Sequence, residues 1–191
     1  MLAPTGAGHV HGRIGGGGHR RAGFGNPGHP QQRLLGGVRH LCDRHGALLI
    51  FDEVIEGLGR TGKMFCCEHF VTPDILVLGK SLGGGLLPFA GIVARGELNR
   101  VAHRSVGHYT HEKNALCTTA ALAAIQVLED EGLPQRAAEL GEYGLERLRE
   151  MQTRHRLIGH MSGLGLHLGI DLVRDRATRQ PPLPKPLCTA V

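Results

Sequence analysis

Short apolar runs alternate with longer stretches of mixed apolar and polar positions through the middle of the chain. Residues 47–51 ("ALLIF") and 75–78 ("ILVL") are continuously apolar, and "FAGIVAR" at 89–95 holds a third run. Runs of four or five apolar residues between turn residues are typical of strands in a parallel sheet. The pattern therefore predicts three such strands, the first two buried on both faces.

Helical periodicity marks three other segments, at 36–46, 115–131 and 134–154. The first places Val38, Leu41 and Cys42 on one face and ends at Gly46. The third carries an inward face made of Leu140, Leu145 and Leu148. The alternation in "LGLHLGIDLV" at 164–173 is typical of a half-buried strand. These elements together predict an α/β fold, a mainly parallel sheet with flanking helices.

The two ends of the chain lack this patterning. Residues 1–36 are glycine-rich, and we expect this stretch to be mostly without regular structure because ordering glycine is costly. The proline-rich "QPPLPKPL" near the C-terminus excludes a helix or an inner strand. We predict four parts: a disordered segment at 1–36, an α/β domain at 37–156, the start of an α+β domain at 157–176 and a tail at 177–191.

The positive charge of the chain is local. The net charge is +5, but no acidic residue precedes Asp43, whereas five arginines do. The remainder is neutral, with 17 basic and 17 acidic residues. A solvated, disordered tail accounts for this balance, with an RNA-binding tail as the alternative. We therefore expect no nucleic-acid partner.

Cysteine usage points to a reducing compartment. The five cysteines are odd in number and irregularly spaced, which argues against a disulfide framework. No apolar run reaches the roughly 20 residues of a membrane helix, and no secretory signal pattern is visible. We expect a cytoplasmic protein without a membrane partner. "CCEH" at 66–69 suggests zinc, but adjacent cysteines lack the usual ligand spacing, so we predict no metal site.

The stretch "LLIFDEVIEGLGRTGK" at 48–63 resembles two nucleotide-site signatures run together. An apolar strand ends in Asp52, and G-x-x-x-x-G-K follows. A working phosphate loop directly follows its strand and has Ser or Thr after its lysine, whereas Met64 follows Lys63 here. The acidic strand also precedes the loop, the reverse of the usual order. These departures argue against an ATPase.

Pyridoxal phosphate chemistry fits the same residues better. This cofactor needs a carboxylate beside its pyridinium nitrogen and a lysine amine for a Schiff base. Asp52 ends one apolar strand, and Lys80 follows another just before a glycine run. Burial there is expected to strip water from Lys80, which frees its amine to attack an aldehyde. An interval of 28 residues allows two parallel strands that carry both side chains to the C-terminal edge of one sheet, where open α/β sheets bind ligands.

The region from about Gly36 to Asp175 resembles the class III aminotransferases. The resemblance is carried by the D-E-V-x-x-G-x-G-R-T-G element, the P-D-I strand, and the lysine followed by glycines. It implies part of the large domain of a pyridoxal phosphate-dependent transferase of fold type I, plus the start of a C-terminal α+β domain. The family includes ornithine, acetylornithine, 4-aminobutyrate and omega-amino acid transaminases.

The resemblance also implies roles for single residues. Asp52 would pair with the pyridine nitrogen, Val54 would pack on the cofactor ring, and Lys80 would form the Schiff base and shuttle a proton. Thr110 would bind the cofactor phosphate of a neighbouring subunit, which implies a homodimer. His108 and His111 line the pocket or cap a helix, and Arg60 is interpreted as a partner for turn carbonyls. His111–Lys113 and Ala115 depart from the family pattern, which affects the substrate pocket more than the cofactor.

The expected reaction is transfer of an amino group between an amino acid or amine and a 2-oxo acid. A lyase or decarboxylase of the same fold, and a non-catalytic fragment, are the alternatives. The family's upstream phosphate-binding loop and downstream substrate arginine have no counterpart in the sequence. We therefore expect weak or no activity for this chain alone, and ends that are unrelated to the family.

Overall fold

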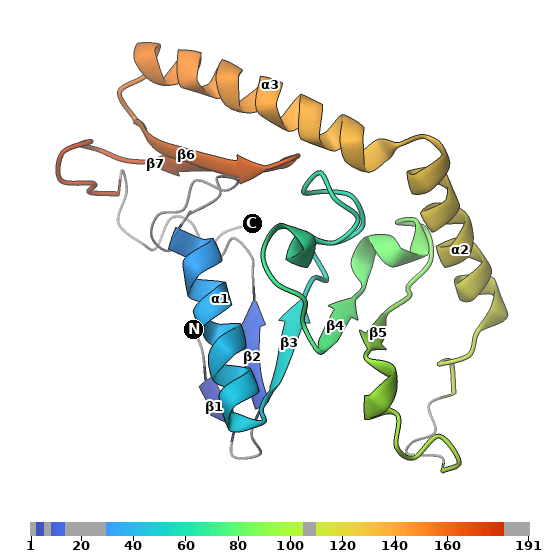
Figure 1. Ribbon diagram of the computed structural model, residues 1–191. Helices are drawn as coiled ribbons and strands as arrows, with labels where there is room; N and C mark the ends of the chain where they lie inside the picture. The colour runs from blue at the N-terminus through green and yellow to red at the C-terminus, as the bar shows by residue number, and fades with distance from the viewer. Residues whose placement is uncertain (1–2, 6–8, 14–29, 105–109, 182–191) are drawn as a thin grey trace.

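The computed structural model describes residues 3–5, 9–13, 30–104 and 110–181. Ten helices and strands follow one another along this part of the chain (Figure 1). They are β1 (Ala3–Thr5), β2 (His9–Arg13), α1 (Pro30–His45), β3 (Leu48–Asp52), β4 (Ile75–Leu78), β5 (Gly91–Ala94), α2 (Ala115–Asp130), α3 (Leu133–Arg154), β6 (Ile158–Leu164) and β7 (His167–Leu172). Three short 3-10 helices lie between them: η1 (Cys66–His69), η2 (Lys80–Gly83) and η3 (Gly96–Leu98).

The first five strands form one sheet in the order β1-β2-β3-β4-β5. The three central strands β2, β3 and β4 are parallel, and both outer strands are antiparallel to their neighbours. The α/β fold class is confirmed, and the strand predicted at 75–78 has the same bounds in the structure. The antiparallel edges were not predicted.

Residues 1–36, predicted to be mostly without regular structure, form helix or strand in three stretches. Residues 3–5 and 9–13 form β1 and β2, and α1 begins at Pro30. β2 pairs with β3 in register His9 to Leu48, so its partner lies far away in the sequence. A search for local periodicity misses a short strand of this kind, because a distant strand supplies its hydrogen bonds.

The core lies between α1 and the central strands. Leu49 and Phe51 of β3 are each 1% exposed and pack with Val38 and Cys42 of α1. Residues of β3 that point to the other face are only half-buried, so the prediction of burial on both faces was wrong. Leu41, predicted to share the buried face of α1, is 53% exposed. The side chains of α1 that face the sheet, Val38 and Cys42, are four positions apart.

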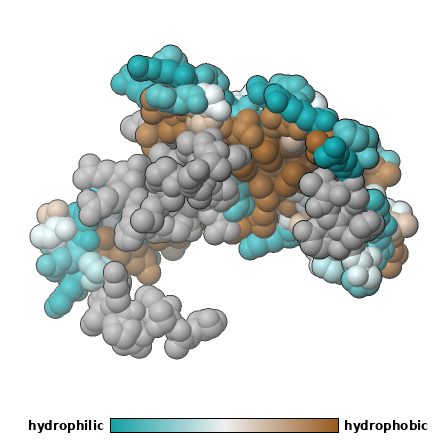
Figure 2. Space-filling view, turned by 90° about the horizontal axis from the view of Figure 1, so that it is seen from below, coloured by the Kyte–Doolittle hydropathy of each residue, from teal (hydrophilic) through white to brown (hydrophobic). Residues whose placement is uncertain are grey.

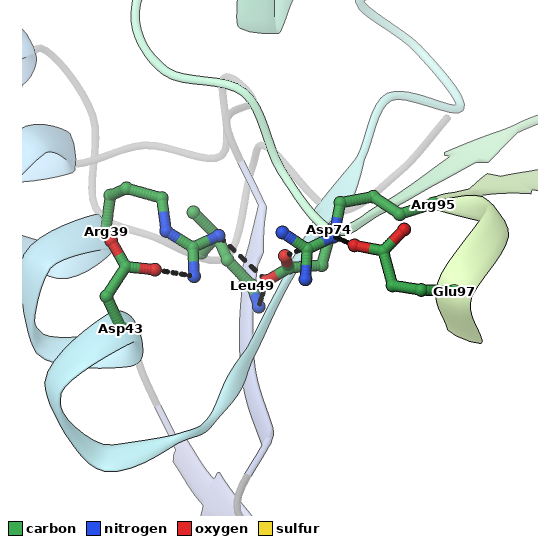
Figure 3. Close-up of polar contacts among 6 residues, drawn as sticks. All are labelled: Arg39, Asp43, Leu49, Asp74, Arg95 and Glu97. Atoms are coloured by element: carbon green, nitrogen blue, oxygen red, sulfur yellow. Dashed lines mark hydrogen bonds and ion pairs between the residues drawn. The ribbon is translucent and has the colours of Figure 1, made fainter.

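The buried carboxylate of Asp74 joins four segments at the edge where β4 begins (Figure 3). Its Oδ2 accepts hydrogen bonds from the Leu49 backbone N–H at 2.7 Å and from Arg39 of α1 at 2.8 Å. Arg95, directly after β5, lies 3.2 Å from Oδ1. Burial alone would raise the pKa of this carboxyl, but these donors outweigh burial and hold its pKa below the ordinary value.

The helices α2 and α3 follow the predicted bounds closely. The Asn114 side chain caps α2 by accepting a hydrogen bond from the Leu116 N–H at 2.9 Å. The buried face of α3 is made by Ala137 and Gly141, whereas Leu140, predicted to be inward, is 42% exposed. The residues on this face must be small, because a Cβ at Gly141 would overlap the Gly165 carbonyl in the turn between β6 and β7.

The hairpin β6–β7 forms a separate two-stranded antiparallel sheet that packs against α3. The strand predicted at 164–173 corresponds to β7, while β6 was not predicted. Of the tail predicted at 177–191, residues 177–181 are described and the remainder lies outside the described residues. No helix in the described part of the chain is long and apolar enough to cross a membrane. The division of the chain into four domains stays a prediction.

Large apolar side chains are exposed at one edge of the sheet and on α2. Ile92 and Val93 of β5 are 67% and 56% exposed, and Leu116 of α2 is 65% exposed. Seen from below, the molecule has a hydrophobic area bordered by hydrophilic surface (Figure 2). Exposed apolar areas are typical of surfaces that contact other protein.

Candidate active site

The structure brings Asp52 and Lys80 to the same edge of the sheet. Strands β3 and β4 are parallel neighbours, with Asp52 paired in register to Val77. Asp52 is the last residue of β3, and Lys80 follows the end of β4 by two positions. Both side chains therefore start from the carboxyl ends of adjacent strands, the position that the 28-residue interval predicted. Their chemical roles stay a prediction.

The segment after Asp52 bends back over the end of β4. The Val54 N–H donates a hydrogen bond to Asp52 Oδ1 at 3.2 Å, which fixes the orientation of a half-buried carboxylate. The Val54 side chain lies against Gly79, where an added Cβ would be 3.4 Å from Val54 Cγ1. Val54 is thus placed next to the residue that precedes Lys80.

Lys80 is exposed, so the expectation that burial removes its water was wrong for this chain. Glycines lie close after it, and they have no side chains to cover the amine. Its backbone has φ +49°, a left-handed conformation that non-glycine residues adopt rarely and that occurs often at functional sites. Gly84 and Gly85 also have positive φ, so the turn itself requires glycine at these positions.

The glycine-rich stretch 57–63 forms a turn that binds its own backbone. Arg60 Nε donates to the Ile55 carbonyl at 2.9 Å, which confirms its interpretation as a partner for turn carbonyls. Lys63, the residue in the phosphate-loop lysine position, donates to the Glu68 carbonyl at 3.0 Å. Its amine therefore holds η1, which agrees with the prediction that this turn is not the phosphate loop of an ATPase.

Glu53 is a residue of this region that was not predicted from the sequence. It is 2% exposed, and its carboxylate accepts hydrogen bonds from the backbone N–H groups of Cys66 and Cys67 at 2.7 and 2.6 Å. Burial raises the pKa of the Glu53 carboxyl, although these two donors favour its charged form. The signal available in the sequence was the second acid of "DE", directly after the strand.

The thiols of Cys66 and Cys67 are buried next to this carboxylate. Burial, and then the charge of Glu53, raise the pKa of each thiol to about 12. Among the residues that the structure describes, no group of three or more His, Cys, Asp or Glu side chains is placed to hold a metal ion. Within the described part of the chain, Cys66, Cys67, Cys42 and Cys117 are free.

Thr110 does not join Asp52 and Lys80 within one chain. β5 is antiparallel to β4, so the chain leaves β5 near Asp74, where the Arg95 N–H donates to the Asp74 carbonyl at 3.1 Å. The stretch before α2 lies at the end of the sheet opposite the ends of β3 and β4 (Figure 1). The Thr110 side chain is exposed. His111 is exposed as well, Asn114 caps α2, and His108 lies outside the described residues.

Known proteins are similar to this chain in sequence. The model of the family "Aminotransferase class-III" matches residues 23–190, a wider span than residues 36–175. (R)-1-hydroxy-2-aminoethylphosphonate ammonia-lyase from Vibrio splendidus is 39% identical over 74% of this chain and 30% of its own length. Ornithine aminotransferase 1 from Staphylococcus aureus is 42% identical over 78% of this chain and 37% of its own.

Solved structures of aminotransferases are similar to this chain in fold. An aminotransferase from Bacillus anthracis superposes with a TM-score of 0.73 at 36% identity, covering 81% of this chain and 36% of that chain. Taurine:2-oxoglutarate aminotransferase from Bifidobacterium kashiwanohense, solved in complex with PLP and glutamate, gives 0.71 at 28% identity, covering 81% and 36%. The chain thus spans about a third of the length of these relatives. It belongs to the class III aminotransferase family.

Proposed function

We propose that this chain provides the cofactor-binding sheet edge of a pyridoxal phosphate-dependent transaminase. The reaction is transfer of an amino group between an amino acid or amine and a 2-oxo acid. The observation that supports it best is the placement of a carboxylate, Asp52, and an amine, Lys80, at the carboxyl ends of adjacent parallel strands. Ligands of open α/β sheets bind at this edge.

The residues present fit the cofactor. Pyridoxal phosphate, when bound, supplies an electron sink for charge that develops at the substrate carbon. Asp52 would keep the pyridine nitrogen protonated, and the Val54 N–H holds one of its carboxylate oxygens. Val54 would lie against the cofactor ring. Lys80 would hold the cofactor through its amine and would serve as the acid and base that transfers a proton at the substrate.

The remaining partners are also proposals. Thr110 would bind the cofactor phosphate of a second subunit in a homodimer. The exposed apolar residues of β5 and α2 offer surface for contact with other protein. The cytoplasm suits the free thiols of the described cysteines, because they are stable in a reducing compartment.

Covalent labelling tests this function. The protein is mixed with pyridoxal phosphate, inspected for a yellow absorption band, reduced with borohydride and digested with trypsin. Attachment at Lys80 blocks cleavage after that residue, so the peptide 64–80 is replaced by a longer, cofactor-bearing peptide. Lys113→Ala, which removes an exposed amine outside this turn and leaves peptide 64–80 intact, serves as control and keeps the band. An equal band in Lys80→Ala would refute the role of Lys80.

A lyase of the same fold is the second candidate. The similarity to a protein named as an ammonia-lyase supports it. A transaminase converts a supplied 2-oxo acid to an amino acid, whereas a lyase releases ammonia without an acceptor. Measuring both products with the same amino donor separates the two reactions.

A further inference from the structure

Every polar group of Glu53, on its backbone and its side chain, makes a hydrogen bond. Its N–H donates to the Val77 carbonyl of β4 at 2.9 Å, and its carbonyl accepts from the Gly57 N–H at 3.1 Å. Its Oε2 and Oε1 accept from the N–H groups of Cys66 and Cys67 at 2.7 and 2.6 Å. The residue therefore joins the end of β3, the neighbouring strand, the glycine-rich turn and the start of η1.

The residues on either side of Glu53 are those assigned to the cofactor. Asp52 precedes it, and Val54 follows it and donates its N–H to the Asp52 carboxylate at 3.2 Å. Val54 also contacts Gly79, the residue before Lys80. Any shift of Glu53 would move Asp52 and Val54 together, because one peptide unit separates each of them from it.

The pair of N–H donors requires a carboxylate at this position. A carboxylate offers an acceptor oxygen to each donor, whereas the amide of glutamine offers one oxygen and turns an NH₂ group toward the other donor. The site is 2% exposed, so water does not replace a lost acceptor. This position therefore requires both oxygens of a carboxylate, and a side chain of the same size is not sufficient.

Building on the proposed function, we propose that Glu53 is a positioning residue for the cofactor site. Its carboxylate, held by the first two N–H groups of η1, fixes Asp52 and Val54 relative to Lys80. It touches neither cofactor nor substrate and acts through its two neighbours.

Glu53→Gln tests this role by two measurements on the yellow band of the protein with pyridoxal phosphate. We expect the affinity for the cofactor to fall about tenfold, the effect of losing one buried hydrogen bond to a charged group. The pH midpoint of the band should move in the same direction as in Asp52→Asn. Glu68→Gln is the matched control, because Glu68 also accepts a backbone N–H in this turn, from Phe65 at 2.7 Å, but does not adjoin Asp52. It should leave both values unchanged.

Gly57→Ala provides a second variant that keeps the charge of Glu53. An added Cβ would lie 3.0 Å from the Glu53 carbonyl oxygen and 3.2 Å from its Oε2, so the carboxylate must shift. We expect the cofactor affinity and the pH midpoint of the band to change in the same direction as in Glu53→Gln, but by less. If Glu53→Gln does not fold, as judged by circular dichroism, Gly57→Ala decides the question.

Alkylation with iodoacetamide, read by peptide mass, gives an answer without the cofactor. Tryptic peptide 64–80 contains Cys66 and Cys67, and peptide 40–44 contains Cys42 as an internal reference. We expect Glu53→Gln to speed labelling of the first peptide at least about tenfold and to leave the second unchanged.

The outcomes separate the two proposals. A wild-type protein without the band refutes the proposed function and this inference together. A wild-type band whose affinity and pH midpoint stay the same in Glu53→Gln and in Gly57→Ala refutes the positioning role alone. A lower melting temperature with an unchanged midpoint also refutes the positioning role, because a merely structural residue would act in that way.

Discussion

Replacing Asp74 by asparagine should destabilise the fold without touching the candidate active site. Asp74 is 3% exposed and lies at the edge of the sheet where β4 begins, away from the ends of β3 and β4. Asparagine has nearly the same shape, so the substitution removes the charge and leaves the packing in place. The change in the free energy of unfolding therefore reports the charged interactions of one residue.

The magnitude follows from its partners. Oδ2 accepts from the Leu49 N–H at 2.7 Å and from Arg39 at 2.8 Å, and a hydrogen bond to a charged group contributes about 1.5–3 kcal/mol. An asparagine oxygen retains these contacts in weaker form. Asp43, 2.6 Å from Arg39, still neutralises that guanidinium, and Arg95 is too exposed to contribute more than about 1 kcal/mol. We expect a loss of about 2–3 kcal/mol.

The assay is equilibrium unfolding in urea at pH 7, followed by circular dichroism. Asp74→Ala also leaves the buried Leu49 N–H without its acceptor, so it should cost about 3–5 kcal/mol. Glu97→Gln is the control, because Glu97 is 64% exposed and pairs with the exposed Arg95, and it should change stability by less than about 0.5 kcal/mol. If Asp74→Asn is as stable as Glu97→Gln, the reasoning about this carboxylate is wrong.

Four further predictions concern stability and reactivity. The folded-state pKa of Asp74 lies below its ordinary 3.8, so its ionised form stabilises the protein fully above that pH. This stability is lost as the pH falls through the lower folded-state pKa. Acid titrations of the stability of Asp74→Asn should lack this loss. Gly165→Ala should cost more than about 2 kcal/mol in urea unfolding, because its φ is +52° and a Cβ would lie 2.6 Å from a backbone carbonyl oxygen; Gly169→Ala, with 3.6 Å to the nearest atom, should be much milder. Asn114→Ala removes the cap of α2 and should cost about 1 kcal/mol by the same measurement, and no loss would mean that the cap is dispensable. Cys66, whose pKa is about 12, should react with iodoacetamide at pH 8 far more slowly in native protein than in urea, and equal rates would contradict its burial.

The local sequence pattern was sufficient to predict the helices and strands whose signal lies within their own residues. β4 has the predicted bounds, and α2 and α3 differ from prediction by one residue at an end. Chain-local signals such as apolar runs and helical periodicity determine such elements. The same signals failed for β1, β2 and β6. Of these, β2 pairs with β3, which lies far away in the sequence, whereas β1 and β6 pair with the next strand along the chain.

The candidate site divides in the same way. Asp52 and Lys80 were found from motif and spacing, because a carboxylate and an amine at two strand ends form a recognisable chemical pair. Glu53 and Asp74 were not assigned a role, since their partners lie 13 to 35 positions away. A buried carboxylate is interpretable only when its hydrogen-bond donors are known.

The sequence by itself determined the α/β class, the family, and the two residues that are proposed to bind the cofactor. Tertiary structure alone decided which helix faces are buried, that both outer strands are antiparallel, and that Lys80 is exposed. The physical reason is that secondary structure and motif chemistry arise from neighbours along the chain. Burial and strand pairing arise from contacts between distant segments, and these exist only in the folded molecule.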